Sequence, residues 1–184
     1  CLVIICLEVV KHMQEFKQEK AVNMDGVNLL ASILLRYPDI GTISLDPETD
    51  LLKITFTLDK RVLSEEFEKF KELLVNSISA YHYLEKIEEA KIKINTEVHE
   101  NTLFVHILRD MSTVSQNEIK LINTLMNEHF GAAIIRDSIG NTEQDNDGLQ
   151  EELIDHMLGN IKINHVSEHI IGLWEEGRVL VFNK

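Results

Sequence analysis

Apolar positions alternate with polar ones along some stretches of the chain and return every three or four residues along others. Residues 51–58 are apolar at every second position, which predicts a half-buried β-strand. In residues 64–85 the apolar positions recur at steps of three and four, which predicts a long amphipathic helix with one buried stripe. Residues 102–110 alternate again, and 115–130 have helical spacing that begins with a capping box.

A unit of strand, helix and strand occurs twice in a row, with an offset of about 51 residues. Leu52–Phe56 aligns with Leu103–Ile107, and Ser64, which opens the first helix, aligns with Ser115, which opens the second. Further elements flank or complete the two units. They are a helix from Asp25 to Tyr37 ended by Pro38, a strand over 41–45, a strand over 91–97, a strand over 132–136 after a left-handed helix stop at Gly131, a helix over 149–158, and a hairpin of 170–174 with 178–182 around a three-residue turn.

From residue 51 to 137 the order is strand, helix, strand, strand, helix, strand, which resembles the ferredoxin-like split βαβ sandwich. We therefore expect an α+β fold built on a tandem βαβ repeat, with an added edge strand, an N-terminal helix, and a C-terminal helix plus hairpin. The expected divisions are an apolar flank and linker at 1–24, a core at 25–138, an acidic linker at 139–148, and a C-terminal part at 149–184 that docks on the core or on a partner. Element order alone implies no function.

The strand at 102–110 is expected at the centre of the sheet, with Leu103, Val105 and Ile107 facing the helices. Its other face carries Phe104, His106 and Leu108, which is more apolar than a solvated face. Two explanations stay open. Either the N-terminal helix or the C-terminal segment covers this face, or a second copy of the chain does. Trp174 in the C-terminal hairpin is a further candidate for an interface.

Composition argues against several classes of partner. Among 184 residues, 18 Lys and Arg stand against 31 Asp and Glu, so the net charge of −13 argues against nucleic acid and against an anionic membrane surface. The third strand of the predicted set has one aromatic residue and no positive charge before Arg109, unlike an RNA-binding sheet of this order. The first ten residues are apolar but too short to span a bilayer, and residues 1–12 are interpreted as an extension or a fragment edge. Two cysteines are typical of a reducing, cytoplasmic location.

The segment from His165 to His169 has the spelling H-x-x-E-H, which resembles the signature of inverted zinc proteases. On a helix, His165 and His169 would lie on one side, with Glu168 beside them. Such enzymes need a further carboxylate downstream, and only Glu175 or Glu176 in a predicted turn is available. A pair of surface histidines in a connector is the competing interpretation.

Two further polar patterns invite a site. Residues 143–148 resemble the first half of a calcium loop, but Ile154 stands where the bidentate glutamate should be, so an acidic linker is the preferred interpretation. Arg109-Asp110 and Arg136-Asp137 end strands at equivalent places in the two halves. They form either a paired polar site or solvated strand ends. No glycine-rich phosphate loop is present, and no cofactor is expected.

Three hypotheses follow. The first is a non-catalytic binding or regulatory module that engages a protein partner or a small metabolite, as a homodimer. In outline it resembles regulatory ACT domains. The second is a metal-dependent enzyme that uses His165, Glu168 and His169. The third is a scaffold component of a larger assembly that is engaged through the hairpin around Trp174.

Overall fold

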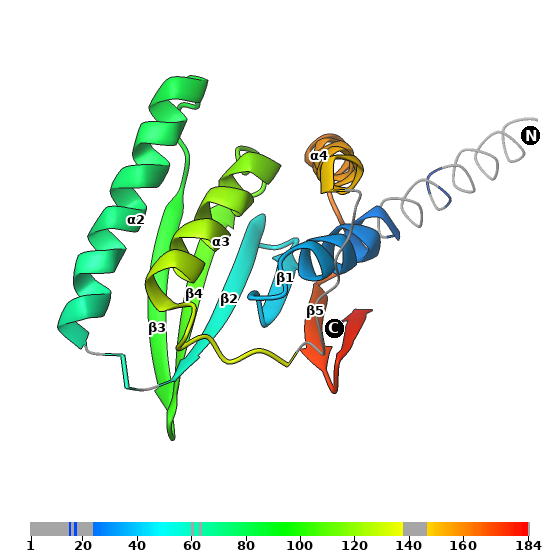
Figure 1. Ribbon diagram of the computed structural model, residues 1–184. Helices are drawn as coiled ribbons and strands as arrows, with labels where there is room; N and C mark the ends of the chain where they lie inside the picture. Colours follow the sequence, from blue (N-terminus) through cyan, green and yellow to red (C-terminus); the bar gives the residue numbers. More distant parts are fainter. Residues whose placement is uncertain are drawn as a thin grey trace, which may run out of the picture.

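The computed structural model describes residues 24–59, 61–62, 64–137 and 147–183, together with Glu15 and Lys17. Within this part of the chain, four helices and a six-stranded antiparallel sheet form an α+β fold (Figure 1). The strands are β1 (Thr42–Asp46), β2 (Leu51–Asp59), β3 (Ile92–His99), β4 (Thr102–Asp110), β5 (Ile170–Glu175) and β6 (Arg178–Asn183). Their order across the sheet is β3-β4-β2-β1-β5-β6.

The helices are the N-terminal helix, described over 24–36, and α2 (Ser64–Glu85), α3 (Gln116–Phe130) and α4 (Asp147–Asn164). The capping box of α3 is confirmed, because the Ser115 side chain accepts a hydrogen bond from the backbone amide of Glu118. The helix predicted over 149–158 is longer than expected. Gly159 does not end it, because the buried stripe of α4 continues from Leu158 to Ile161.

The hydrophobic core lies between the helices and one face of the sheet. β2 contributes alternate side chains that are fully buried, from Leu52 to Leu58, and β4 contributes Leu103, Val105 and Ile107. α2 and α3 cover this side with apolar stripes, whose buried members include Phe67, Phe70, Leu74, Ile78, Ile119, Ile122, Met126 and Phe130. The predicted strands 51–58 and 91–97 therefore belong to one sheet, and 102–110 is a strand, as expected.

The N-terminal helix covers the same face of the sheet, over β1 and β5. Gly172 of β5 allows this close approach, because a Cβ atom there would lie 3.0 Å from Leu34 Cδ1 and 3.3 Å from Leu30 Cβ. The same Cβ would lie 3.5 Å from Ile43, a neighbour on β1. The N-terminal helix therefore cannot cover the Phe104 side of the sheet, which is the opposite face.

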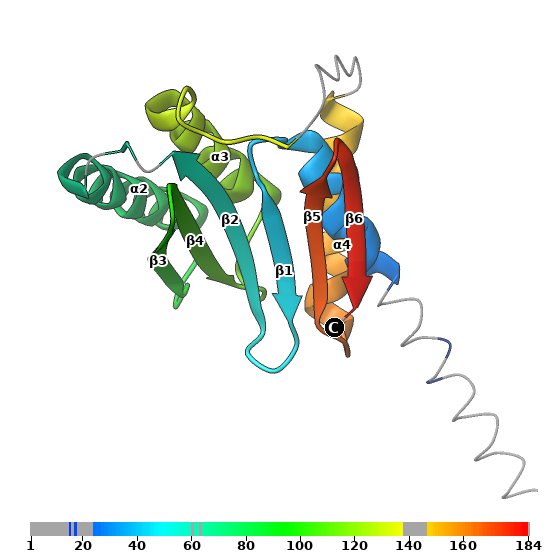
Figure 2. The same cartoon turned by 90° about the horizontal axis from the view of Figure 1, so that it is seen from below.

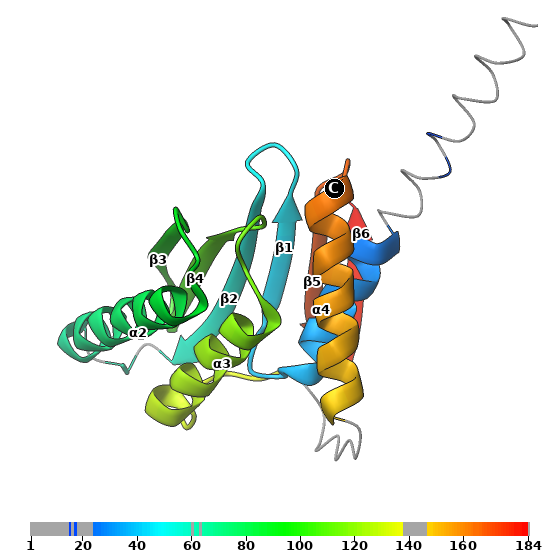
Figure 3. The same ribbon diagram turned by 90° about the horizontal axis from the view of Figure 1, so that it is seen from above.

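The C-terminal part docks on the core. β5 pairs with β1, so the hairpin extends the sheet and does not cover it. α4 lies over the N-terminal helix (Figure 3), and Glu151 accepts hydrogen bonds from Arg36 and from Lys120 of α3, each at 2.9 Å. In the described part of the chain, therefore, neither the N-terminal helix nor the C-terminal segment covers the face that carries Phe104, His106 and Leu108.

Two predictions about the sheet were wrong. The strand at 41–45 was expected at an edge, but β1 lies in the interior because β5 pairs with its free side. Residues 132–136 form only an isolated bridge between Ile134 and Leu58, with Ile135 N donating to Thr57 O at 2.8 Å. The cause is competition for one edge of β2. Since β1 pairs with β2 up to Thr55, only the last residues of β2 are left.

Two local geometries also differ from expectation. Gly131 has φ −50°, so it continues the right-handed helical conformation and is not a left-handed stop. The C-terminal hairpin has a two-residue turn, because Glu175 pairs directly with Arg178. Glu176 and Gly177 both have positive φ, 50° and 74°, which is the type I′ geometry that suits the twist of the two strands.

Most of the predicted N-terminal flank (1–24) and acidic linker (139–148) lies outside the described residues, and so does the calcium-like segment up to residue 146. Residues 147 and 148 belong to α4. In the part of the chain that the structure describes, no helix has the length and apolar character needed to cross a bilayer.

Candidate functional site

The face of the sheet opposite the helices is uncovered by the described helices. Figure 2 shows β1, β2, β5 and β6 with the N-terminal helix and α4 behind them. Because paired residues of antiparallel strands share a face, the register defines the side chains on this open face. Two rows cross all six strands: Lys93-Leu108-Lys53-Ser44-Ile171-Phe182 and Asn95-His106-Thr55-Thr42-Leu173-Leu180.

The open face has two apolar regions with a polar strip between them. We call Phe104 and Leu108 the β4 patch. The second region is the β5–β6 patch, which consists of Ile171, Leu173, Leu180 and Phe182. Leu180 is 39% exposed and Phe182 is 45% exposed. In monomeric proteins, large contiguous apolar patches on the surface mark interaction sites.

Three polar side chains from adjacent strands lie near one another on the open face: Thr55 of β2, His106 of β4 and Glu97 of β3. His106 Nδ1 lies 2.9 Å from Thr55 Oγ1, and His106 Nε2 lies 3.7 Å from a carboxylate oxygen of Glu97. Burial lowers the pKa of His106, the charge of Lys53 lowers it further, and the nearby Glu97 carboxylate only partly opposes both. His106 is therefore held toward its neutral form.

A hydroxyl, an imidazole and a carboxylate in this order resemble a nucleophile, its base and an orienting group. Thr55, however, is only 5% exposed. Its strand pairs on both sides, with β1 and with β4, so the nearby backbone amides are used in the ladders and do not form an oxyanion hole. The hydrogen bond to Thr55 therefore orients the His106 ring on the open face, and the described residues around it do not provide an oxyanion hole.

A buried polar network lies on the other side of the sheet, where β4 ends. Arg109 continues the alternation of Leu103, Val105 and Ile107, so it faces the helices and is fully buried. Its guanidinium forms a bidentate ion pair with Glu118 of α3, which is also fully buried, and one of the two contacts measures 3.1 Å. Arg109 also donates to the Asp110 carboxylate and to the backbone carbonyl of Lys91.

His82 and Asp110 complete this network. His82 Nε2 lies 2.8 Å from Glu118 Oε2, and because a carboxylate only accepts, the imidazole donates. Burial alone would raise the pKa of Asp110, but hydrogen bonds from Thr113, Lys91, Ser112 and Arg109 outweigh it and hold that pKa well below its ordinary value. The network joins the ends of β4 and α2 to the start of α3, so its role is structural.

Surface cavities lie among the described residues at both ends of β2. One, of about 300 Å³, lies beside Asp110 and is lined by Thr49, Asp50, Leu51, Glu88, Glu89, Lys91, Asp110, Ser112 and Thr113. The other, of about 350 Å³, lies at the opposite end of β2 and is lined by Asp59, Arg61, Val62, Glu66, His129, Phe130, Ala132 and Ala133. Among the described residues, no three His, Cys, Asp or Glu side chains are grouped to hold a metal ion.

The H-x-x-E-H segment does not form the helix that its metal site required. His165 follows α4 with φ 54°, and residues 165–169 are a connector before β5. Glu168 accepts a hydrogen bond from Asn183 of β6, and His165 Nδ1 lies 3.7 Å from Asp50. The structure therefore does not bring His165, Glu168 and His169 together around one point.

The two strand-end pairs are also separated. Arg109 lies opposite Leu52 at the start of β2, whereas the segment before Arg136 bridges to Leu58 at its end. Arg136 forms an ion pair with Asp39 at 2.5 Å. Asp137 accepts a hydrogen bond from the Glu176 amide at 3.3 Å.

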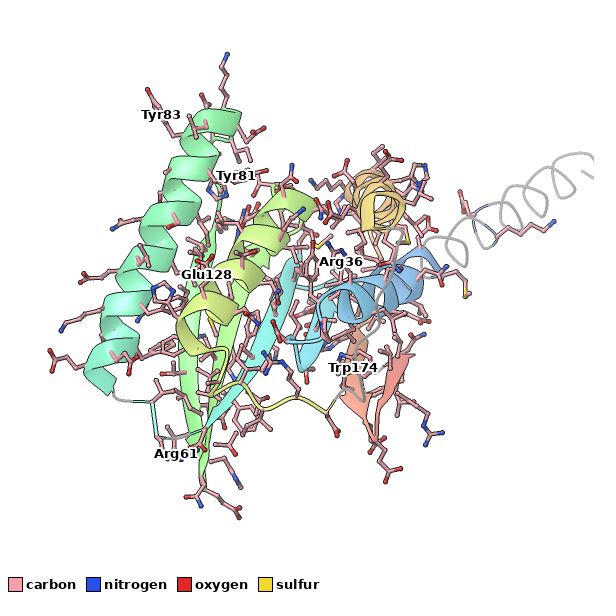
Figure 4. The ribbon with its side chains drawn as sticks, in the orientation of Figure 1. Arg36, Arg61, Tyr81, Tyr83, Glu128 and Trp174 are labelled. Carbon is pink, nitrogen blue, oxygen red and sulfur yellow. The ribbon has the colours of Figure 1, made fainter. Side chains whose placement is uncertain are left out.

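Trp174 does not share a surface with Phe104, His106 and Leu108. It alternates with Leu173 on β5 and so lies on the helix side of the sheet, beside β5 in Figure 4. Its indole Nε1 is buried and has no hydrogen-bond partner among the described residues.

Sequence reasoning did not identify the partners of Arg109. The signal for its burial was present, since an arginine two positions after Ile107 must face the helices if Leu103, Val105 and Ile107 do. Glu118 was recognised only as part of a capping box. Its second role as an ion-pair partner depends on where α3 docks, which is a tertiary property.

Comparisons with protein-family models, with curated proteins and with solved structures find no match for this chain. Function is therefore inferred from the surfaces of the molecule alone.

Proposed function

We propose that the chain is a non-catalytic binding module that engages a protein partner through the open face of its sheet and works as a homodimer in the cytoplasm. The observation that carries this proposal is the open face itself. It presents the β4 patch and the β5–β6 patch on a six-stranded sheet, and no described helix lies over it.

The arrangement of β3, β4 and β2 supports a ferredoxin-like interpretation. α2 connects β2 to β3 across the intervening β4, as in a split βαβ unit, and β1 occupies the place of the fourth strand. Thr55 and His106 are hydrogen-bonded and 51 residues apart, which equals the offset of the sequence repeat. An approximate two-fold axis through this pair would relate β2 and α2 to β4 and α3.

The dimensions of the open face suit an amphipathic polypeptide. β4 and β5 are three strand spacings apart, so the two patches lie about 14 Å from each other at roughly 4.8 Å per spacing. A helix spans that distance in about nine residues at 1.5 Å each. A chain with net charge −13 favours a partner of net positive charge through long-range attraction.

The experiment uses the double substitution Phe104→Ser/Leu108→Ser on the full chain. Leu84→Ser is the matched control, because Leu84 is an exposed leucine (75%) on α2, away from the open face. Proteins retained by the wild type are identified by mass spectrometry, and the purified partner is titrated by calorimetry. We expect the double variant to lose at least about tenfold in affinity and the control to bind like the wild type. Equal binding by all three would reject the open face as the site.

A small metabolite is the second candidate ligand. The cavity of about 350 Å³ beside Phe130 and Arg61 falls within the size range of ligand pockets and is lined by both apolar and charged side chains. Arg61 already pairs with Asp59 at 2.8 Å, so an anionic ligand would compete with that carboxylate.

A further inference from the structure

The free edge of β6 is a second surface that has no partner among the described elements. We infer that two copies of the chain join through β6 in antiparallel register, so that two six-stranded sheets become one continuous sheet. This inference deepens the proposed function, because it assigns an interface to the homodimer. It is tested without any other partner.

The backbone of β6 is available for pairing along one side. Among the described strands, only β5 pairs with β6. The two-residue turn makes Glu175 and Arg178 a hydrogen-bonded pair, and such pairs alternate along an antiparallel ladder. Arg178, Leu180 and Phe182 therefore direct their amides and carbonyls toward β5. Val179, Val181 and Asn183 direct theirs toward the open edge.

The side chains of β6 do not protect this edge. Natural edge strands are commonly blunted by charged side chains, which discourage pairing with another chain. The other edge strand, β3, exposes charged side chains at Lys93 and Glu97. Within β6 the only charged residue is Arg178, next to the turn, and the sequence from 179 to 182 is Val-Leu-Val-Phe. Leu180 and Phe182 are among the exposed large apolar side chains.

The strand is self-complementary in one register. When the two-fold axis passes between Val181 and its copy, Leu180 lies opposite the partner's Phe182, and this apolar pair occurs twice. The outward-directed groups then meet in hydrogen-bonded pairs, because Val181 faces the partner's Val181 and Val179 faces the partner's Asn183. Moving the axis to Leu180 would place Phe182 opposite Arg178. The Val181 register therefore gives both exposed apolar side chains, Leu180 and Phe182, an apolar neighbour on the partner strand.

This dimer also changes the open face. Leu180 and Phe182 belong to the β5–β6 patch, so pairing at β6 joins the patches of the two copies into one apolar strip. The β4 patches stay at the two far ends of the combined sheet, where each remains accessible to a partner.

The first test is a proline substitution that acts on only one side of the strand. Val181→Pro removes an outward-directed amide and leaves the β5–β6 hydrogen bonds in place. Thr96→Pro is the matched control on β3. The two-residue turn there makes His99 and Thr102 the hydrogen-bonded pair, so Thr96 also directs its amide outward. Sedimentation velocity and light scattering on the full chain give the mass, and circular dichroism checks the fold.

We expect dimers for the wild type and for Thr96→Pro, and a monomer for Val181→Pro, with dimerisation weakened at least about thirtyfold. A monomeric wild type, or a Val181→Pro variant that dimerises like the wild type, would overturn the inference. So would a dimer that is lost in Phe104→Ser/Leu108→Ser but kept in Val181→Pro, because that result would place the interface on the open face.

A second pair of variants tests the register and does not depend on proline. Leu180→Lys/Phe182→Lys places like charges opposite each other across the two-fold axis and is expected to be monomeric. Leu180→Glu/Phe182→Lys places opposite charges there and is expected to dimerise. Equal behaviour of these two variants would overturn the proposed register. Because neither measurement uses a protein partner, this inference and the partner-binding proposal fail separately.

Discussion

The ion pair between Arg109 and Glu118 allows a quantitative prediction, because both side chains are fully buried. Glu118→Gln keeps the shape of the side chain and removes its charge. The guanidinium then retains Asp110 as its only carboxylate partner. The NH2 group of the new side chain can only donate, so it cannot accept the hydrogen bonds that Arg109 and His82 donate to the carboxylate. Removing one partner of a buried pair costs about 3–5 kcal/mol. Since Asp110 still accepts from Arg109, we expect the lower end, about 3 kcal/mol.

The assay is equilibrium unfolding in urea at pH 7, followed by circular dichroism. With a slope of about 2 kcal/mol/M, a loss of about 3 kcal/mol lowers the midpoint by roughly 1.5 M. Lys69→Gln is the control, because its ion pair with Glu65 is 75% and 82% exposed, and such pairs contribute less than about 1 kcal/mol. A midpoint for Glu118→Gln that differs from the wild type no more than the control does would refute the reasoning.

The double variant Arg109→Met/Glu118→Leu separates burial of charge from loss of packing. It removes both charges, and Asp110 keeps hydrogen bonds from Lys91, Ser112 and Thr113. Replacing a buried pair by apolar side chains is often close to neutral. We therefore expect the double variant to be more stable than Glu118→Gln. A double variant that loses the sum of both single effects would show that the two residues act independently.

Two further outcomes are expected. Because hydrogen bonds outweigh burial and lower the folded pKa of Asp110 below its ordinary value near 3.9, the carboxylate stabilises the fold above that pH, and this stabilisation is lost as the pH falls through the folded pKa. The cost of Asp110→Asn in urea should be complete at pH 7 and shrink below about pH 4, and a cost independent of pH would contradict this. Gly172→Val, whose Cβ meets Leu34 at 3.0 Å, should cost about 1–3 kcal/mol in thermal unfolding. Gly159→Ala on α4, where a Cβ meets nothing within 4 Å, should not destabilise, and equal melting temperatures for both variants would argue against close docking at Gly172.

The sequence by itself determined the elements whose signals are local. The alternation in 51–58 and 102–110, the helical stripe from Ser64 and the cap at Ser115 all appear in the structure within a few residues of the expected bounds. These signals are reliable because period and capping depend on neighbours along the chain. The apolar second face of β4 was also recognisable from alternation alone, before anything was known of what covers it.

Only the tertiary structure decided which strands pair, and thereby which surfaces stay open. Residues 132–136 and β1 compete for one edge of β2, and nothing local in either segment indicates that β1 takes most of it. The pairing of β5 with β1 moves a presumed edge strand into the interior and creates a new edge at β6. Likewise, alternation along β4 places Arg109 on the helix side, but only the docking of α3 supplies Glu118 as its partner. Pairing and docking depend on contacts between segments far apart in the chain, so each is chosen against competitors that only the folded molecule brings together.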